Sequence, residues 1–114
     1  MMTKDNLVQN MLKKIQDALE KRNVVWRQHS LARMLERNIS RDDVFSAIQG
    51  GKLIESYSEA KPYPSYLISG RSGQKTVHVV VAWNDDVYSV YIITVYIPDT
   101  NHFQENGVTR KSRG

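Results

Sequence analysis

The sequence predicts an α+β fold, with N-terminal helices packed on a four-stranded twisted antiparallel sheet. The main observation is one change of hydrophobic period. Apolar residues recur at helical spacing up to about residue 49 and alternate as in strands from 52 to 97. The chain has 114 residues without an internal repeat or a Pro/Gly-rich linker. These features are typical of a single domain with one core.

Three helices are expected in the first half of the chain, over residues 4–22, 27–37 and 41–49. Thr3 is placed to cap the first helix, and Asn23 to end it in a left-handed conformation. Ser40 is placed to cap the third, with Asp43 completing a capping box. The expected apolar faces are Leu7, Met11, Ile15, Ala18 and Leu19 in the first helix, Ser30, Leu31, Met34 and Leu35 in the second, and Val44, Phe45 and Ile48 in the third.

Four strands are expected in the second half, over residues 52–57, 65–71, 74–83 and 87–97. Ser72-Gly73 is read as the two-residue turn of a hairpin between the second and third strands. A turn at that point pairs Arg71 with Gln74, and it places Leu67 opposite His78.

Composition excludes several kinds of chemistry. The chain has no cysteine, so disulfides, cysteine nucleophiles and thiolate metal sites are excluded, and its three histidines are too widely spaced for a zinc cage. No cofactor or metal is therefore expected. No apolar run is long enough to span a membrane, and the first residues do not resemble a signal peptide, so a cytoplasmic location is expected.

The net charge of +4 is concentrated in the helical half, where residues 1–49 carry nine bases and six acids. Residues 50–97 carry four of each, and residues 98–114 carry three bases and two acids. This distribution favours an anionic partner such as nucleic acid. A slightly basic protein without such a partner is the alternative.

The first candidate site is the polar face of the second helix. His29, Arg33 and Arg37 follow one another at intervals of four residues, so their side chains line one face. Histidine exchanges protons near neutral pH, and arginine stabilises charge on a phosphate. This combination suits RNA cleavage without a metal. The alternative is a solvated helix face in which Glu36 neutralises an arginine.

Thr94 and Tyr96, near the end of the last strand, are the second candidate. Alternation places them on the same face as Val90 and Ile92. Their polar tips suit a phosphate or a stacked base, although tyrosine is also a common strand residue.

Further candidates are His78, Arg71 and the basic tail. His78 lies within the expected strand over residues 74–83, and it is either a site residue or a structural histidine. Arg71, before the hairpin turn, offers a cation to an anion, the alternative being an ordinary turn. Arg110 and Lys111 could add phosphate contacts.

An ordered set of segments resembles the bacterial domain of unknown function 4258. The set begins with HSLARMLERNIS at residues 29–40 and continues through Asp43-Val44, Ile48, Gly51, Ile54, Tyr57, PYPS at 62–65, Gly70-Arg71, HVVV at 78–81 and ITVYIP at 93–98. The resemblance spans residues 26–111. It leaves 1–25 as an N-terminal helical extension and 112–114 as a basic end within one domain.

The resemblance implies the fold of interferase-like toxins, which groups the RelE-type and barnase–colicin type ribonucleases. It implies a metal-independent endoribonuclease of a toxin–antitoxin system, with RNA, the ribosome and a cognate antitoxin as partners. By this analogy His29, Arg33, Thr94 and Tyr96 are active-site residues, with Arg37, His78 and Arg71 binding RNA. The alternative class is a non-catalytic module that binds RNA or protein.

Overall fold

The computed structural model describes residues 4–98. Its elements in chain order are α1 Lys4–Glu20, β1 Val24–Trp26, α2 Gln28–Glu36, α3 Arg41–Gln49, β2 Lys52–Tyr57, β3 Ser65–Ser72, β4 Lys75–Asn84 and β5 Ser89–Tyr96. Arg22, rather than Asn23, takes the left-handed conformation after α1, at a φ of 66°. The expected cap Thr3 and the tail residues Arg110 and Lys111 lie outside the described residues.

The strands form one five-stranded sheet in the order β1-β5-β4-β3-β2. Strands β2 to β5 are antiparallel, as predicted, but β1 pairs in parallel with β5. The prediction of four strands, all antiparallel, is therefore wrong. Three residues are too few to show an alternating pattern in the sequence. Strand β1 is therefore recognised only in the structure, by its pairing with the edge of β5.

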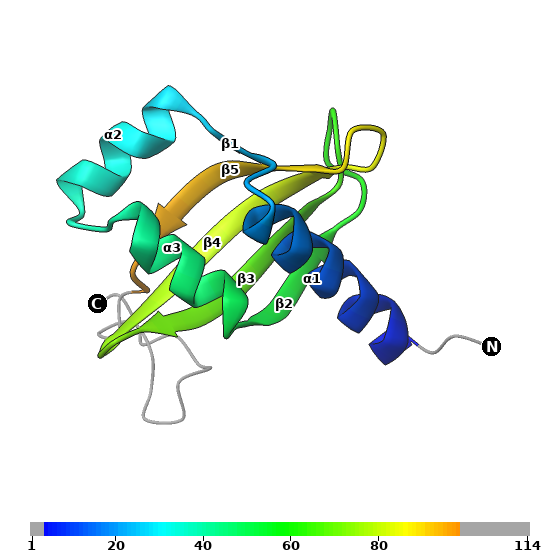
Figure 1. Cartoon of the computed structure of the whole chain (residues 1–114), viewed down its shortest axis with the longest axis horizontal. Helices are drawn as coiled ribbons and strands as arrows, with labels where there is room; N and C mark the ends of the chain where they lie inside the picture. The colour runs from blue at the N-terminus through cyan, green and yellow to red at the C-terminus, as the bar shows by residue number, and fades with distance from the viewer. Residues whose placement is uncertain (1–3, 99–114) are drawn as a thin grey trace, which may run out of the picture.

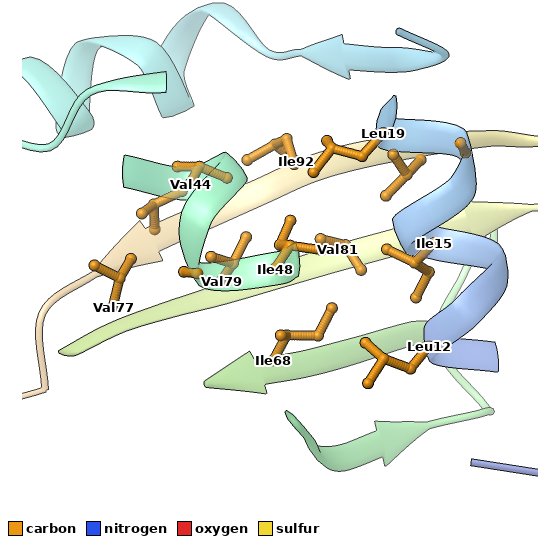
Figure 2. Packing of buried hydrophobic residues seen from close by; sticks show 14 of the residues in the cluster. Leu12, Ile15, Leu19, Val44, Ile48, Ile68, Val77, Val79, Val81 and Ile92 are labelled. Carbon is orange, nitrogen blue, oxygen red and sulfur yellow. The ribbon is translucent and has the colours of Figure 1, made fainter. Parts of the chain in front are cut away.

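Helices α1 and α3 lie across the same face of the sheet, and α2 lies beside β5 (Figure 1). The hydrophobic core fills the space between the two covering helices and the sheet (Figure 2). Its residues include Leu12, Ile15, Leu19, Val44, Ile48, Ile68, Val77, Val79, Val81, Val90, Ile92 and Val95. Burying each aliphatic side chain of this size contributes about 1.5–3 kcal/mol.

The expected apolar faces of two helices need correction. In α1, Leu12 is buried, whereas Leu7 is 56% exposed. In α2, Ser30 and Met34 are buried as predicted, but Leu35 is 83% exposed. The reason is that α2 lies at the margin of the sheet, where only a narrow stripe of the helix meets β5.

The β3–β4 hairpin turns one residue later than predicted. Ser72 pairs with Lys75, which leaves Gly73 and Gln74 in the turn, and Gly73 takes a φ of 61°. Glycine accepts this left-handed conformation without steric cost. The shift places Ser69, not Leu67, opposite His78.

A bulge in β5 reverses the predicted faces of its last residues. Val81 pairs with Ile92 and Val80 with Thr94, so Ile93 is the extra residue. Beyond the bulge Val95 joins the core, and Thr94 and Tyr96 lie on the opposite face from Ile92. Strict alternation cannot reveal this, because a single extra residue exchanges the two faces.

Asp43 joins the start of α3 to the β3–β4 hairpin. The predicted capping box is present, with N–H···O distances of 3.0 Å from Asp43 to Ser40 Oγ and 2.8 Å from Ser40 to Asp43 Oδ2. The carboxylate also accepts hydrogen bonds from Ser72 Oγ at 2.7 Å and Lys75 Nζ at 2.9 Å. These bonds, led by that from the Ser40 backbone, hold the pKa of Asp43 well below its ordinary value.

Replacing Asp43 with asparagine is expected to lower the free energy of unfolding at pH 7 by about 1.5 kcal/mol, the usual contribution of hydrogen bonds to a charged group. Because the folded-state pKa is lowered, the carboxylate stabilises the fold above the ordinary pKa of about 3.9 and loses this contribution as the pH falls below it. Urea unfolding from pH 7 to pH 2 should therefore show the variant and wild type converging in acid. Asp42→Asn, an exposed neighbour, is the matched control. A difference that stays constant across this range would contradict the assignment.

Candidate functional site

No described helix lies across the sheet face opposite α1 and α3 (Figure 1), which we call the open face. Three of the predicted site residues, His78, Thr94 and Tyr96, share this face through the pairs His78–Tyr96 and Val80–Thr94. The open face consists of Lys52, Glu55 and Tyr57 on β2, Ser65, Leu67, Ser69 and Arg71 on β3, Thr76, His78, Val80 and Ala82 on β4, and Tyr91, Thr94 and Tyr96 on β5.

His78 and Tyr96 form a polar pair at one end of the open face. The His78 Nδ1 atom lies 3.3 Å from the Tyr96 hydroxyl, and the rings meet edge to face with centroids 5.3 Å apart. Burial lowers the pKa of the His78 imidazole, against the opposing effect of the nearby Glu55 charge. Burial, and then the same charge, raises the pKa of the Tyr96 hydroxyl. At neutral pH the pair is therefore an uncharged imidazole beside a protonated phenol.

Glu55 and Tyr57 extend this pair onto β2. The Tyr57 hydroxyl donates a hydrogen bond to Glu55 Oε1, and this bond raises the pKa of Tyr57. Alternation along β2 brings both residues to the open face, since Glu55 pairs with Leu67 and Tyr57 with Ser65. We name Glu55, Tyr57, His78 and Tyr96 the open-face cluster.

Helix α2 covers the edge of β5 beyond the point where β1 ends. Ser30 Oγ lies 3.1 Å from the carbonyl of Ile92 and 2.6 Å from that of Ile93, and Arg37 Nη1 donates to the carbonyl of Val95 at 2.7 Å. Arg37 therefore satisfies a carbonyl at the edge of the sheet, a structural role that its helical spacing did not reveal. Because Ser30 contacts Ile92 and Ile93 while Arg37 contacts Val95, α2 runs alongside β5 in the same direction.

His29 lies at the margin of the open face. It lines a hollow of about 300 Å³ together with Ala82 of β4 and Ile93 of β5. Arg33 follows one helical turn later, is mostly exposed, and has a nitrogen 3.9 Å from a carboxylate oxygen of Glu36. Both members of the expected pair thus flank β5, but Arg33 is also the neutralised cation of the alternative interpretation.

Arg71 lies beside the hairpin turn, at the end of the open face that holds His78 and away from His29, and its Nη2 atom donates to the carbonyl of Gln74 at 3.3 Å. Thr94 lies between the two ends, opposite Val80. The structure therefore brings His78 and Tyr96 into contact. It sets His29 and Arg71 at opposite ends of the same surface.

Sequence reasoning missed two groups of residues on this surface. Glu55 was not singled out, because a single carboxylate on a strand forms no motif. Its spacing of two residues from Tyr57 does predict that the two side chains share one face of the strand. Arg27, Lys61 and Tyr63, which line the hollow, come from segments distant in sequence. The PYPS segment at residues 62–65 carried part of the family resemblance, but its Tyr63 was not considered as a site residue.

Within residues 4–98, no group of three or more His, Cys, Asp or Glu side chains is arranged to hold a metal ion. Of the helices in this range, none has the length and apolar character needed to cross a bilayer.

The fold and site define an α+β domain with one helix-covered and one open sheet face. A model of the family described as "Domain of unknown function (DUF4258)" matches residues 26–97, which is more than half of the chain. The chain belongs to this family, as its sequence segments predicted. No curated protein and no solved structure matches it.

Proposed function

We propose that the protein is a ribonuclease that cleaves RNA on its open face without a metal ion, as the toxin of a toxin–antitoxin pair. The observation that carries this proposal is the contact between His78 and Tyr96, two groups able to exchange protons, on a sheet face that the described helices leave uncovered. Helices that precede an antiparallel sheet support a RelE-like fold, with β1 as an addition. RNA in the cytoplasm and a cognate antitoxin are the partners that this role requires.

The proton transfers follow from the protonation states of the pair. Neutral His78 takes the proton of the RNA 2′-hydroxyl, whose oxygen attacks the adjacent phosphorus. The bond from phosphorus to the 5′-oxygen breaks, and that oxygen receives the Tyr96 proton. The imidazolium then returns a proton to the phenolate, which restores both groups. The products are a 2′,3′-cyclic phosphate and a 5′-hydroxyl.

Arginines at the margins suit the charge of the substrate. Arg33 lies on α2 beside β5, and Arg71 lies next to the β3–β4 turn. A guanidinium can contact a phosphate through two hydrogen bonds and stabilise the extra charge of a pentacoordinate phosphorus. Thr94, between these groups, is placed to position the RNA backbone.

The test uses the purified full-length protein with a single-stranded oligoribonucleotide in EDTA, and bacteria in which the protein is induced. We expect cleavage with cyclic-phosphate ends, growth arrest, and no cleavage when the attacking 2′-hydroxyl is replaced by hydrogen. Intact RNA both in the tube and in the cells would overturn the proposal. RNA that is bound in a salt-dependent manner but never cleaved would instead support the binding-module alternative.

A further inference from the structure

The hollow beside β5 has a composition suited to one class of ligand. Its volume of about 300 Å³ is that of a small-molecule site. Its walls come from the start of α2 and the loop before β3, and its floor is formed by the sheet. The lining residues are Arg27, His29, Lys61, Pro62, Tyr63, Ser65, Ala82 and Ile93. None of these eight side chains is acidic, and Arg27 and Lys61 are cations at neutral pH, so the hollow favours an anion.

Aromatic contacts hold one wall of the hollow in place. The Arg27 guanidinium lies over the Tyr91 ring, 5.9 Å from its centroid. The Tyr63 ring packs edge to face on the same Tyr91 ring, with centroids 5.4 Å apart. The Tyr91 hydroxyl in turn accepts a hydrogen bond from Asn84 Nδ2 at 3.1 Å. A cation and an aromatic ring are thus positioned side by side before any ligand arrives.

We propose that this hollow is a nucleotide subsite, in which Arg27 and Lys61 bind a phosphate and Tyr63 contacts the base of a single-stranded RNA. Phosphate selects guanidinium and ammonium groups, and every base can stack on an aromatic ring. The inference rests on the proposed function for its substrate, and it adds a second contact point on that substrate.

The position of the hollow fits a neighbour of the cleaved nucleotide. Ala82, on its floor, is four residues along β4 from His78, a distance of about 13 Å at roughly 3.3 Å per strand residue. One nucleotide cannot occupy both sites, whereas an extended strand can cross the open face from one to the other, passing Thr94. The subsite would then set where along an RNA the cut falls.

The test measures binding by nuclear magnetic resonance on the full-length protein, with adenosine 5′-monophosphate, inorganic phosphate and a short oligodeoxyribonucleotide as separate probes. We expect shifts at Tyr63, Ala82 and Ile93 with the nucleotide, weaker effects with phosphate, and the tightest binding with the oligonucleotide. The double variant Arg27→Ala/Lys61→Ala should lose about tenfold or more in nucleotide affinity, since hydrogen bonds to charged groups are removed. Lys13→Ala, an exposed charge on α1, is the control and should bind as wild type does.

The outcomes separate this inference from the proposed function. Cleavage of RNA with an unchanged cut position and unchanged nucleotide binding in the double variant would overturn the subsite and leave the ribonuclease. Nucleotide binding at the hollow without any RNA cleavage would support the subsite and count against the ribonuclease. Tyr63→Leu, which keeps both cations, should weaken the binding of adenosine 5′-monophosphate but leave the binding of inorganic phosphate unchanged. An equal loss of affinity for both probes would contradict the role given to the Tyr63 ring.

Discussion

Replacing His78 with alanine is expected to slow RNA cleavage by about 10²–10⁴ fold, the usual contribution of a positioned acid or base. The imidazole is the group that takes the 2′-hydroxyl proton, and it lies in contact with the Tyr96 hydroxyl at 3.3 Å. Tyr96→Phe should give a similar loss, because it keeps the ring packing and removes only the hydroxyl. The measurement is the single-turnover cleavage rate of a labelled oligoribonucleotide, with urea unfolding to confirm that each variant folds.

The pH dependence provides a second check on the same residue. The base form of His78 must be uncharged, and burial lowers its pKa below the ordinary value of about 6.5. The rate should therefore remain high below pH 6.5 and fall only as the pH drops through the lowered pKa. The charge of Glu55 raises this pKa, so Glu55→Gln should move the acid limb of the profile to still lower pH.

Comparing His29→Ala with His78→Ala shows which histidine lies at the catalytic centre. In the proposed arrangement His29 belongs to the hollow, so its loss should affect the rate less than the loss of His78 does. Undiminished cleavage by His78→Ala, together with abolished cleavage by His29→Ala, would place the chemistry on α2 instead.

Replacing Gly70 with alanine is expected to destabilise the fold by at least about 3 kcal/mol, the upper range for overpacking. Gly70 lies on β3 beneath α3, and a Cβ atom there would be 1.9 Å from the carbonyl oxygen of Ala47. That oxygen belongs to the helix backbone, so it can move only if α3 lifts from the sheet. Because domains of this kind are stable by about 5–15 kcal/mol, the variant should approach unfolding.

The matched control is Gly50→Ala, three residues after Ala47. A Cβ atom at Gly50 would lie 3.6 Å from the Ser46 carbonyl oxygen, an ordinary contact. Its free energy of unfolding should change by no more than about 0.5 kcal/mol. Urea unfolding followed by fluorescence of the buried Trp83 measures both variants. Equal stability of the two would show that α3 does not pack this closely on β3.

The predictable part of the fold lies in residues that act locally. Ser40 and Asp43 predicted the start of α3 because a capping box is formed by residues three apart. The positive φ of Asn38, 59°, is also a local feature, because asparagine adopts the left-handed conformation more readily than most residues. By contrast, Leu35 has the spacing of a core residue and is exposed, because spacing along a helix does not say how much of that helix meets a neighbour.

The candidate site was predictable in its residue types and not in their arrangement. His78, Thr94 and Tyr96 were recognised as chemically suitable, yet alternation assigned Thr94 and Tyr96 to the face of Ile92. They lie on the same face as His78 because of the bulge at Ile93. The bulge is an irregularity in the pairing of β5 with β4, so it is seen only when the two strands are together. Arg37 was also recognised by its residue type, as a group that could bind phosphate. In the structure its guanidinium donates a hydrogen bond to the carbonyl of Val95.

The sequence by itself determined the α+β class, the order of the three helices and four of the five strands, and the family. These follow from periodicity, caps and turns, which are set by residues close together in the chain. Only the tertiary structure decided the parallel strand β1, the exchanged face of β5, and the union of Glu55, His78 and Tyr96 on one surface. Strand pairing brings such residues together across the sheet, and their alignment depends on where the hairpin turns and where the bulge at Ile93 falls, which only the assembled strands decide.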